Sequence, residues 1–205
     1  MFVSFEGIDG CGKSTQVELF TKYLKSKNLD FVKVREPGGT ELGEKIRQLL
    51  INQQMCARSE LLLFLASRAQ LVEEIIKPAL RNKKVVVADR FAHSSLAYQG
   101  CGRELGIDTV QLLNDFATDK IYPDIVFFID VSVDIAMSRI KNTQKDRIER
   151  EERDFWEKIR GCYIELAKKE AYFVTINGER DPESIHKDIV SSFENFYKKM
   201  ELLNC

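Results

Sequence analysis

The sequence lacks any apolar run of about 18 residues, the length that crosses a bilayer as a helix, and we therefore expect no contact with a membrane. A strand-like start that contains Glu6 and Asp9 argues against a signal peptide. An excess of positive charge is also missing, because 31 basic and 32 acidic residues leave a net charge of −1. Without a basic field, nucleic acid is not an expected partner.

Histidine and cysteine are scarce and show no metal-ligand spacing. The two histidines, His93 and His186, are expected to be ordinary surface or helix residues. No C-x-x-C pair occurs among the five cysteines, so we expect reduced thiols in a cytoplasmic protein. Hydrophobic residues make up 44% of the 205 positions, which supports a sizeable core and favours a single domain over residues 1–205.

The strongest motif stands at the start of the chain. A β-rich run, Phe2–Glu6, leads into G-x-x-x-x-G-K-S, and a helical pattern follows directly. This order predicts a phosphate-binding P-loop, whose backbone N–H groups surround phosphate oxygens at a helix N-terminus. Lys13 would reach the outer phosphates of a nucleotide, and the Ser14 hydroxyl would bind Mg²⁺. The residues predicted to bind the nucleotide are Gly7, Ile8, Asp9, Gly10, Cys11, Gly12, Lys13, Ser14 and Thr15.

Apolar runs alternate with segments of helical periodicity along the rest of the chain. Strands are expected at residues 2–6, 31–35, 85–88, 125–130 and 172–176. Helices are expected from the P-loop to residue 28 and at residues 40–50, 59–76, 94–99, 108–118, 133–140, 156–167 and 182–197. This alternation predicts an α/β fold of the P-loop NTPase type, with an open five-stranded parallel sheet and helices on both faces. Ligands of such sheets bind beyond the carboxyl ends of the strands.

Two charged segments leave predicted strands at that edge. Arg35-Glu36-Pro37-Gly38-Gly39-Thr40 suits a loop that closes over a second anion or a base, because a plain turn explains the proline and the glycines but not the charge pair. In Asp89-Arg90-Phe91, Asp89 could hold a Mg²⁺-bound water and Arg90 an acceptor phosphate, or the two could form an internal ion pair. We favour the functional interpretation of both segments.

Two further features each allow two interpretations when only the residues are considered. Phe64 and Arg68 share one face of a helix and could stack on and bond a flat base, although a core phenylalanine beside a surface arginine is the commoner arrangement. The charged segment Lys141–Arg153 is either a solvated face or a mobile lid whose arginines would neutralise charge during phosphoryl transfer.

Together these motifs resemble those of the thymidylate kinase family, whose members phosphorylate dTMP at the expense of ATP. The combination of R-E-P-G-G-T with D-R-x-x-x-S-S-x-A-Y-Q-G is specific to that family. The resemblance spans nearly the whole chain and implies transfer of the γ-phosphoryl group of ATP to dTMP, giving dTDP and ADP for dTTP synthesis, with Mg²⁺ as cofactor. The matching blocks are Gly7–Ser14, Arg35–Thr40, Leu63–Arg68, Asp89–Gly100, and Tyr122–Asp124 before Asp130.

The resemblance also implies roles for matching positions. Phe64 would stack on thymine and Arg68 would bond its O4 edge, while the Tyr98 ring would occupy the space of a ribose 2′-OH. Arg47 and Arg90 would bind the dTMP phosphate. Further substrate contacts would come from Glu36, Pro37, Ser95 and Gln99, and the metal would be held by Ser14 and Asp89.

Members of the family take a catalytic arginine either from the P-loop or from the lid. The variable loop positions here, Ile8 to Cys11, carry no cation, so the chain resembles the bacterial type, with a lid at about residues 141–153. The family also implies a homodimer formed through helix packing. Phe91 is a departure, because tyrosine or histidine is common after the Asp-Arg pair. The expected catalytic residues are Lys13, Asp9, Arg90, Arg147 and Arg153.

Two other classes of protein compete with this interpretation. A P-loop GTPase switch would need a guanine-reading N-K-x-D segment, which the sequence does not contain. Another nucleoside or nucleotide kinase is the closer rival. Its acceptor would distinguish it, because Arg68 and Tyr98 favour a thymine base on a deoxyribose.

Overall fold

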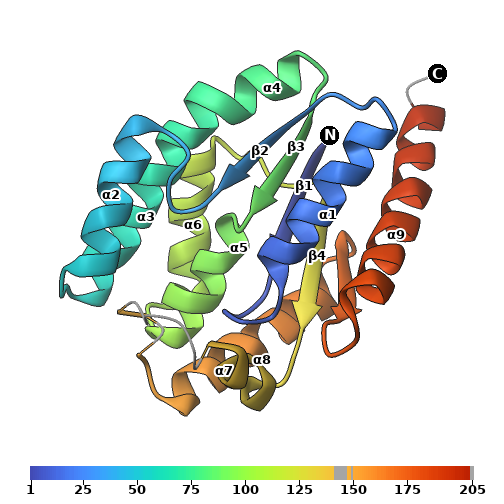
Figure 1. Cartoon of the computed structure of the whole chain (residues 1–205). Helices are drawn as coiled ribbons and strands as arrows, with labels where there is room; N and C mark the ends of the chain where they lie inside the picture. The colour runs from blue at the N-terminus through green and yellow to red at the C-terminus, as the bar shows by residue number, and fades with distance from the viewer. Residues whose placement is uncertain (141–146, 149, 204–205) are drawn as a thin grey trace.

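The computed structural model describes residues 1–140, 147–148 and 150–203 and is built on a five-stranded parallel sheet. Its strand order, β2-β3-β1-β4-β5, places β1 in the centre (Figure 1). The predicted α/β fold with an open parallel sheet is therefore confirmed. The strands are β1 (Phe2–Glu6), β2 (Phe31–Arg35), β3 (Val85–Asp89), β4 (Ile125–Asp130) and β5 (Phe173–Asn177).

Helices pack on both faces of this sheet. α1 (Lys13–Ser26) and α9 (Pro182–Leu203) lie side by side on one face, at the right of Figure 1. The opposite face is covered by helices that include α3 (Ala57–Leu71), the π-helical segment η1 (Val72–Ile76) and α8 (Arg153–Lys169), where η1 packs with Phe2 and Val86 and Tyr163 of α8 stacks on Phe128. The remaining elements are α2 (Glu41–Asn52), α4 (Lys77–Arg81), α5 (Ala92–Ser95), the π-helical segment η2 (Leu96–Gly102), α6 (Ile107–Thr118) and α7 (Val133–Ile140).

The core explains why the central strands are apolar on both sides. All five residues of β1 are buried, as are Val85 to Ala88 of β3, because helices cover each face. On the face of α1 and α9, Phe20 packs edge-on against Phe193 with ring centroids 4.9 Å apart. Burial on both sides fixes the sheet rigidly, and it fixes the loops that leave its carboxyl edge.

The cysteines differ from the prediction of five reduced thiols. Cys101 of η2 and Cys162 of α8 form a disulfide, so that prediction is wrong for this pair. The two residues are 61 positions apart and meet only because η2 packs against α8. Of the other described cysteines, Cys11 is buried and Cys56 is exposed, and both are free.

His93 lies in helix α5 as allowed by the sequence, but it is not a surface residue. Its side chain is 2% exposed and packs among aromatic rings, including the edge-on ring of Phe173 at 5.0 Å. Burial, aided by the positive charge of Arg68, lowers the pKa of His93 from 6.5 to about 3. His93 is therefore neutral in the folded protein at physiological pH.

This burial predicts a loss of stability in mild acid. The unfolded chain protonates His93 below pH 6.5, whereas the folded chain does so only near pH 3. The contribution of neutral His93 to stability is therefore complete above pH 6.5 and declines as the pH falls toward 3. At pH 5 the wild-type chain should have lost about 2 kcal/mol through this group. Urea unfolding of the wild type and His93→Gln between pH 7.5 and 5 tests this, and parallel pH profiles of the two would contradict it.

Candidate functional site

The loop between β1 and α1 forms the cradle that the sequence predicted. Gly10 adopts a φ of +79°, and a Cβ there would lie 2.5 Å from the carbonyl oxygen of Ala136. Gly12 adopts a φ of +97° directly before α1. Side-chain-bearing residues rarely adopt either conformation, so glycine is required for the tight turn. The turn brings backbone N–H groups to the N-terminus of α1, where an anion is stabilised.

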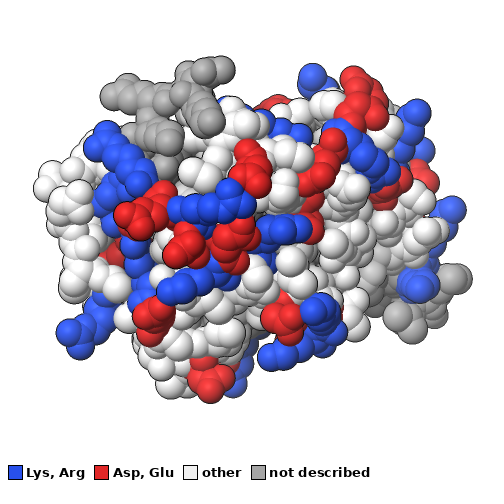
Figure 2. Space-filling model, turned by 90° about the horizontal axis from the view of Figure 1, so that it is seen from below, with Lys and Arg blue, Asp and Glu red and all other residues white. Residues whose placement is uncertain are grey.

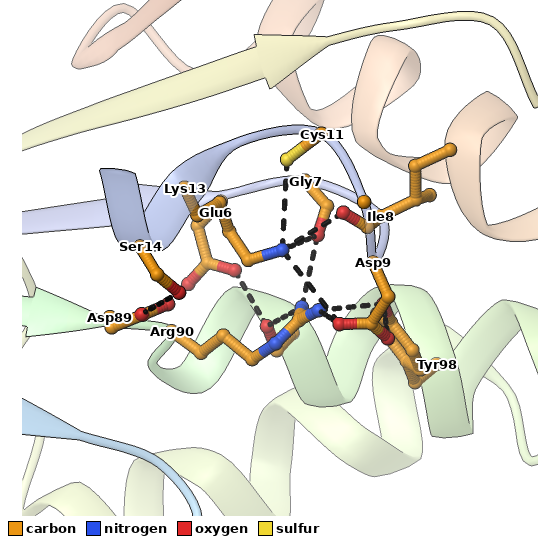
Figure 3. A network of polar contacts seen from close by, with 12 residues as sticks. Glu6, Gly7, Ile8, Asp9, Cys11, Lys13, Ser14, Asp89, Arg90 and Tyr98 are labelled. Atoms are coloured by element: carbon orange, nitrogen blue, oxygen red, sulfur yellow. Dashed lines mark hydrogen bonds and ion pairs between the residues drawn. The ribbon is translucent and has the colours of Figure 1, made fainter. Parts of the chain in front are cut away.

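Lys13 lies inside this loop (Figure 3). Its Nζ donates to the carbonyl oxygens of Gly7 and Ile8, each at 2.9 Å, and lies 4.0 Å from the Asp9 carboxylate. The side chain is only 6% exposed. The carbonyl groups satisfy the Lys13 side chain in its buried position, and it can exchange these contacts for phosphate oxygens.

Arg90, at the end of β3, ties the loop to the neighbouring strand. One end of its guanidinium donates to Gly7 O at 3.0 Å, and the other is ion-paired with Asp9 and donates to the Tyr98 hydroxyl at 2.9 Å (Figure 3). Burial raises the pKa of the Asp9 carboxyl, but Arg90 and Lys13 outweigh it and hold that pKa below its usual value. Asp9 is therefore ionised, between two cations.

Tyr98 takes part in this network through its hydroxyl group as well as its ring. The hydroxyl donates to Asp9 Oδ2 at 3.0 Å, and the Arg90 guanidinium lies over the ring at 4.9 Å from its centroid. The resemblance implied a steric role that needs the bulky ring more than the hydroxyl group. The structure adds a polar role, because the hydroxyl fixes the carboxylate that faces Arg90.

A buried carboxylate beneath Arg90 supports this arrangement. Glu6, at the end of β1, accepts from the Phe91 backbone N–H at 2.8 Å, from Ser94 Oγ at 2.7 Å and from the Tyr163 hydroxyl at 2.8 Å. Ser94 Oγ in turn accepts from Arg90 Nη1 at 3.2 Å. These contacts fix the backbone that follows Arg90, which itself has a φ of +71°. Residue spacing gave no signal for this role of Glu6.

Ser14, in the first turn of α1, meets Asp89 at the end of β3. Ser14 Oγ donates to Asp89 Oδ2 at 2.8 Å, as Figure 3 shows on the side of the loop opposite Asp9. A hydroxyl and a carboxylate are hard oxygen ligands, and Mg²⁺ in nucleotide sites is commonly bound by one or two such groups together with phosphates. The pair therefore fits the predicted metal.

The loop opens into a cavity that suits phosphate groups. Its described cations come from α1, β2, α2, α7 and the residue that follows β3. Figure 2 shows the end of the molecule toward which the strands point, where basic and acidic side chains are interleaved. The described basic residues that line this phosphate cavity are Lys13, Arg35, Arg47, Arg90 and Arg139.

A second cavity, the base cavity, adjoins the first. Phe64 lies on its wall, as does Pro37. Four residues line both cavities, namely Asp9, Glu36, Arg47 and Arg90. The other described lining residues are Arg68, Ser94, Ser95, Tyr98, Gln99 and Ile148.

Arg68 is a buried centre of hydrogen bonding rather than a surface residue. It is 1% exposed and forms an ion pair with Glu36 at 2.6 Å. Nη1 donates to Ser95 Oγ at 3.0 Å and to Asn114 Oδ1 at 2.6 Å, while Nη2 donates to the carbonyl oxygen of Phe91 at 3.3 Å. The arginine thus fixes several parts of the cavity wall at once.

The arginines predicted for the lid lie outside the phosphate cavity as the structure describes it. Arg147 pairs with Glu60 at 2.6 Å and donates from Nε to the carbonyl oxygen of Leu50 at 3.2 Å. Arg153 is the first residue of α8 and pairs with Asp134 and Glu157. The rest of the predicted lid, residues 141–146 and 149, lies outside the described residues.

A cation that the sequence analysis did not assign also contacts the loop. Arg139 of α7 donates to the carbonyl oxygens of Gly10 at 3.3 Å and Gly178 at 3.2 Å. It also lines a third cavity on the far side of the loop, together with Gln16 and Arg180. The sequence did hold a signal for this position, because Arg139 is a basic residue in the last turn of the helix that was predicted at residues 133–140.

Comparisons with known proteins agree with this geometry. The family model described as thymidylate kinase matches residues 5–189, which is most of the chain. The chain belongs to the thymidylate kinase family. It is 69% identical to the thymidylate kinase of Fervidobacterium nodosum over 96% of this chain and 100% of that protein. It is 57% identical to that of Thermosipho melanesiensis, covering 92% of this chain and 95% of the relative.

A solved structure extends the likeness to three dimensions. The crystal structure of thymidylate kinase from Ehrlichia chaffeensis superposes with a TM-score of 0.78 at 36% sequence identity, covering 94% of this chain and 98% of that one. The family match includes both the P-loop and the residues that line the base cavity. The described residues that line the two cavities therefore lie within the part of the chain that the family model matches.

Proposed function

We propose that the two adjoining cavities bind the two substrates of a thymidylate kinase, with the ATP phosphates against the P-loop and dTMP in the base cavity. As a member of that family, the chain transfers the γ-phosphoryl group of ATP to dTMP, giving dTDP and ADP in deoxythymidine nucleotide biosynthesis. The observation that carries the proposal is the shared wall. Asp9 and Arg90 line both cavities, so phosphates held on the two sides would meet there.

The base cavity suits a thymine nucleotide. Phe64 supplies a flat surface for stacking, and the Ser95 hydroxyl supplies an O–H group toward O4. Arg68 would support this contact, because its Nη1 donates to Ser95 Oγ at 3.0 Å and so leaves the hydroxyl hydrogen for the base. Tyr98, held by Asp9 and Arg90, would lie under the sugar and leave no space for a 2′-OH. The rest of the proposed dTMP site is Glu36, Pro37, Arg47, Arg90 and Gln99.

The phosphate cavity suits the donor. The residues proposed to hold ATP are Gly7, Ile8, Asp9, Gly10, Cys11, Gly12, Lys13, Ser14 and Thr15. Arg139 lines both this cavity and the neighbouring third cavity, where Gln16 and Arg180 offer further polar contacts. We propose that the nucleoside part of ATP extends past Arg139 into that space.

Catalysis in this site depends on position and charge. The acceptor oxygen belongs to a 5′-phosphate that is already ionised, so transfer needs no strong base. Lys13 and Arg90 hold the donor and acceptor phosphates in line, while Asp9 keeps Arg90 in place. Arg147, and Arg153 as the second choice, would add positive charge where negative charge develops.

Mg²⁺ is the cofactor that the donor set favours. Ser14 and Asp89 would hold it, because their oxygens lie 2.8 Å apart on the wall of the phosphate cavity. When bound, the ion neutralises charge on the β- and γ-phosphates. With the ion bound, Lys13 and Arg90 would still orient the two substrates through their positive charges.

The proposed function is tested by measuring ADP formation from ATP and Mg²⁺ with dTMP, dUMP, UMP, dCMP and dGMP in parallel. We expect clear preference for dTMP and little turnover of UMP, because Tyr98, held by Asp9, would occupy the 2′ side of the sugar. Preference for another monophosphate would reassign the base cavity. Absence of turnover with every acceptor, together with tight GTP binding, would contradict the kinase assignment.

We propose further that the protein is a homodimer located in the cytoplasm, where ATP is made and consumed. Within the described residues, no helix is long and apolar enough to cross a membrane. The proposed dimer face is formed by α2, α3 and α6, which lie next to one another in Figure 1. These helices expose large apolar side chains, namely Leu42, Leu49, Leu62, Leu112 and Phe116.

Disruption of that face is the corresponding test. Phe116 is 89% exposed, so Phe116→Glu should leave the monomer folded while adding charge to a buried dimer contact. Sedimentation equilibrium should show a dimer for the wild type and a weakening of association by roughly tenfold or more for the variant. A wild-type monomer at micromolar concentration would contradict the proposal.

A further inference from the structure

Glu60 is a buried carboxylate that the mechanism above does not use. It lies on α3, one helical turn before Phe64, and is 1% exposed. Its carboxylate accepts from Gln99 Nε2 at 2.8 Å and from Arg103 at 3.3 Å, and pairs with Arg147 at 2.6 Å. A charged group is rarely buried so completely unless its partners fix it for a purpose.

The carboxylate is ionised and can only accept hydrogen bonds. Burial by itself raises the pKa of Glu60, but the Gln99 amide, Arg103 and Arg147 lower it by more. The pKa of Glu60 therefore lies below its usual value. An ionised carboxylate has no hydrogen to donate. The Gln99 atom that faces Glu60 must therefore be the amide nitrogen, because the carboxamide oxygen cannot donate a hydrogen bond to a carboxylate.

This contact determines which atom of Gln99 meets a ligand. Gln99 lies on the wall of the base cavity, and its Nε2 is turned toward Glu60. The carboxamide oxygen is then the polar atom of this side chain that remains available, within the described contacts, to a bound base. A carbonyl oxygen accepts hydrogen bonds and cannot donate them.

Ser95 lies one turn earlier on the same wall and offers a hydrogen-bond donor instead of an acceptor. Its Oγ accepts from Arg68 Nη1 at 3.0 Å, which leaves the hydroxyl hydrogen for a ligand. The wall therefore presents an acceptor at Gln99 and a donor at Ser95. The edge of thymine or uracil carries the complementary pair, an N3–H donor beside the O4 acceptor. Cytosine carries the reverse pair, an unprotonated N3 beside an amino group.

We propose that Glu60 is a positioning residue that fixes Gln99 as a hydrogen-bond acceptor and so makes the base cavity select bases with an N3–H over cytosine. The inference rests on the proposed function, since it concerns the base of the acceptor nucleotide. Cytosine in this cavity would place its N3 lone pair against the Gln99 oxygen, and two acceptors facing each other without a hydrogen are unfavourable.

Replacement of Glu60 by glutamine tests this directly. Glu60→Gln keeps the shape of the side chain, but its amide can donate to the Gln99 oxygen and let the Gln99 carboxamide turn over. We expect the ratio of kcat/KM for dTMP to that for dCMP to fall by roughly 10- to 100-fold. The ratio for dTMP to dUMP should stay within about threefold, because both bases present the same edge.

The controls separate positioning from a general structural role. Arg103→Gln removes one partner of Glu60 but leaves the carboxylate to hold Gln99, so its dTMP to dCMP ratio should match the wild type. Turnover of dTMP by the wild type establishes the proposed function independently. An equal loss of activity on all three acceptors in Glu60→Gln, or an unchanged dTMP to dCMP ratio, would overturn the role of Glu60.

A measurement on the wild type keeps the proposal testable if Glu60→Gln does not fold. The side-chain amide of Gln99 can be observed by NMR in protein labelled with 15N-glutamine and assigned by its absence in Gln99→Met. Its hydrogens should exchange with water roughly tenfold or more slowly than those of the exposed Gln53, both with and without dTMP. Equal exchange at the two amides would overturn the proposal.

Discussion

Lys13→Ala is expected to lower kcat by roughly 10²- to 10³-fold, which is the range for loss of one preorganised charged donor at a developing charge. The Lys13 ammonium lies within the loop, 2.9 Å from two carbonyl oxygens, so it is already placed where the outer phosphates would bind. Alanine removes the charge and leaves nothing to replace it. Steady-state kinetics with saturating ATP and dTMP measures the effect on the transfer step.

The fold should survive this substitution. The loop is shaped by glycines with positive φ and by the end of β1, neither of which depends on the lysine. Lys22→Ala, on an exposed position of the same helix, is the matched control and should keep wild-type kcat. Unaltered turnover in Lys13→Ala, with folding verified by circular dichroism, would remove the P-loop assignment.

The fold could be predicted because its determinants are local in the sequence. Val85 to Ala88 is a short run of apolar residues that suits a strand buried on both faces, and the structure places it beside β1. The P-loop likewise depends on spacing within one segment. Helix boundaries were less accurate. α8 begins at Arg153 rather than near Trp156, because its first two residues, Arg153 and Asp154, are polar and exposed and so precede the apolar periodicity.

The contacts that determine the chemistry could not be predicted in the same way, because they join distant segments. Arg68 has the spacing of a surface arginine, and only the fold brings Glu36 and Asn114 to its guanidinium. Similarly, Glu60 precedes Phe64 by one turn and Arg68 by two, so the three share a face. That spacing was a usable signal, but the partner Gln99 was not visible in it.

Arg147→Ala is expected to lower kcat by roughly 10²- to 10³-fold while changing KM for dTMP by no more than about threefold. A cation that meets charge only as the phosphoryl group moves contributes to the transition state and little to substrate binding. Arg147 lies outside both cavities in this structure, next to Ile148, which lines the base cavity. To act, the guanidinium would exchange the Glu60 carboxylate for phosphate oxygens, which are anionic partners of the same kind.

Substitution of two other arginines, Arg139 and Arg153, provides the controls for Arg147→Ala. Arg139 contacts the loop backbone and lines the third cavity, so Arg139→Ala should mainly raise KM for ATP. Arg153→Ala should reduce kcat less than Arg147→Ala, because Arg153 forms exposed ion pairs that are weak in water. An effect of Arg147→Ala confined to KM for dTMP would show that Arg147 serves only to stabilise Glu60 and the base cavity. The positive charge for transfer would then have to come from Arg139 or Arg153.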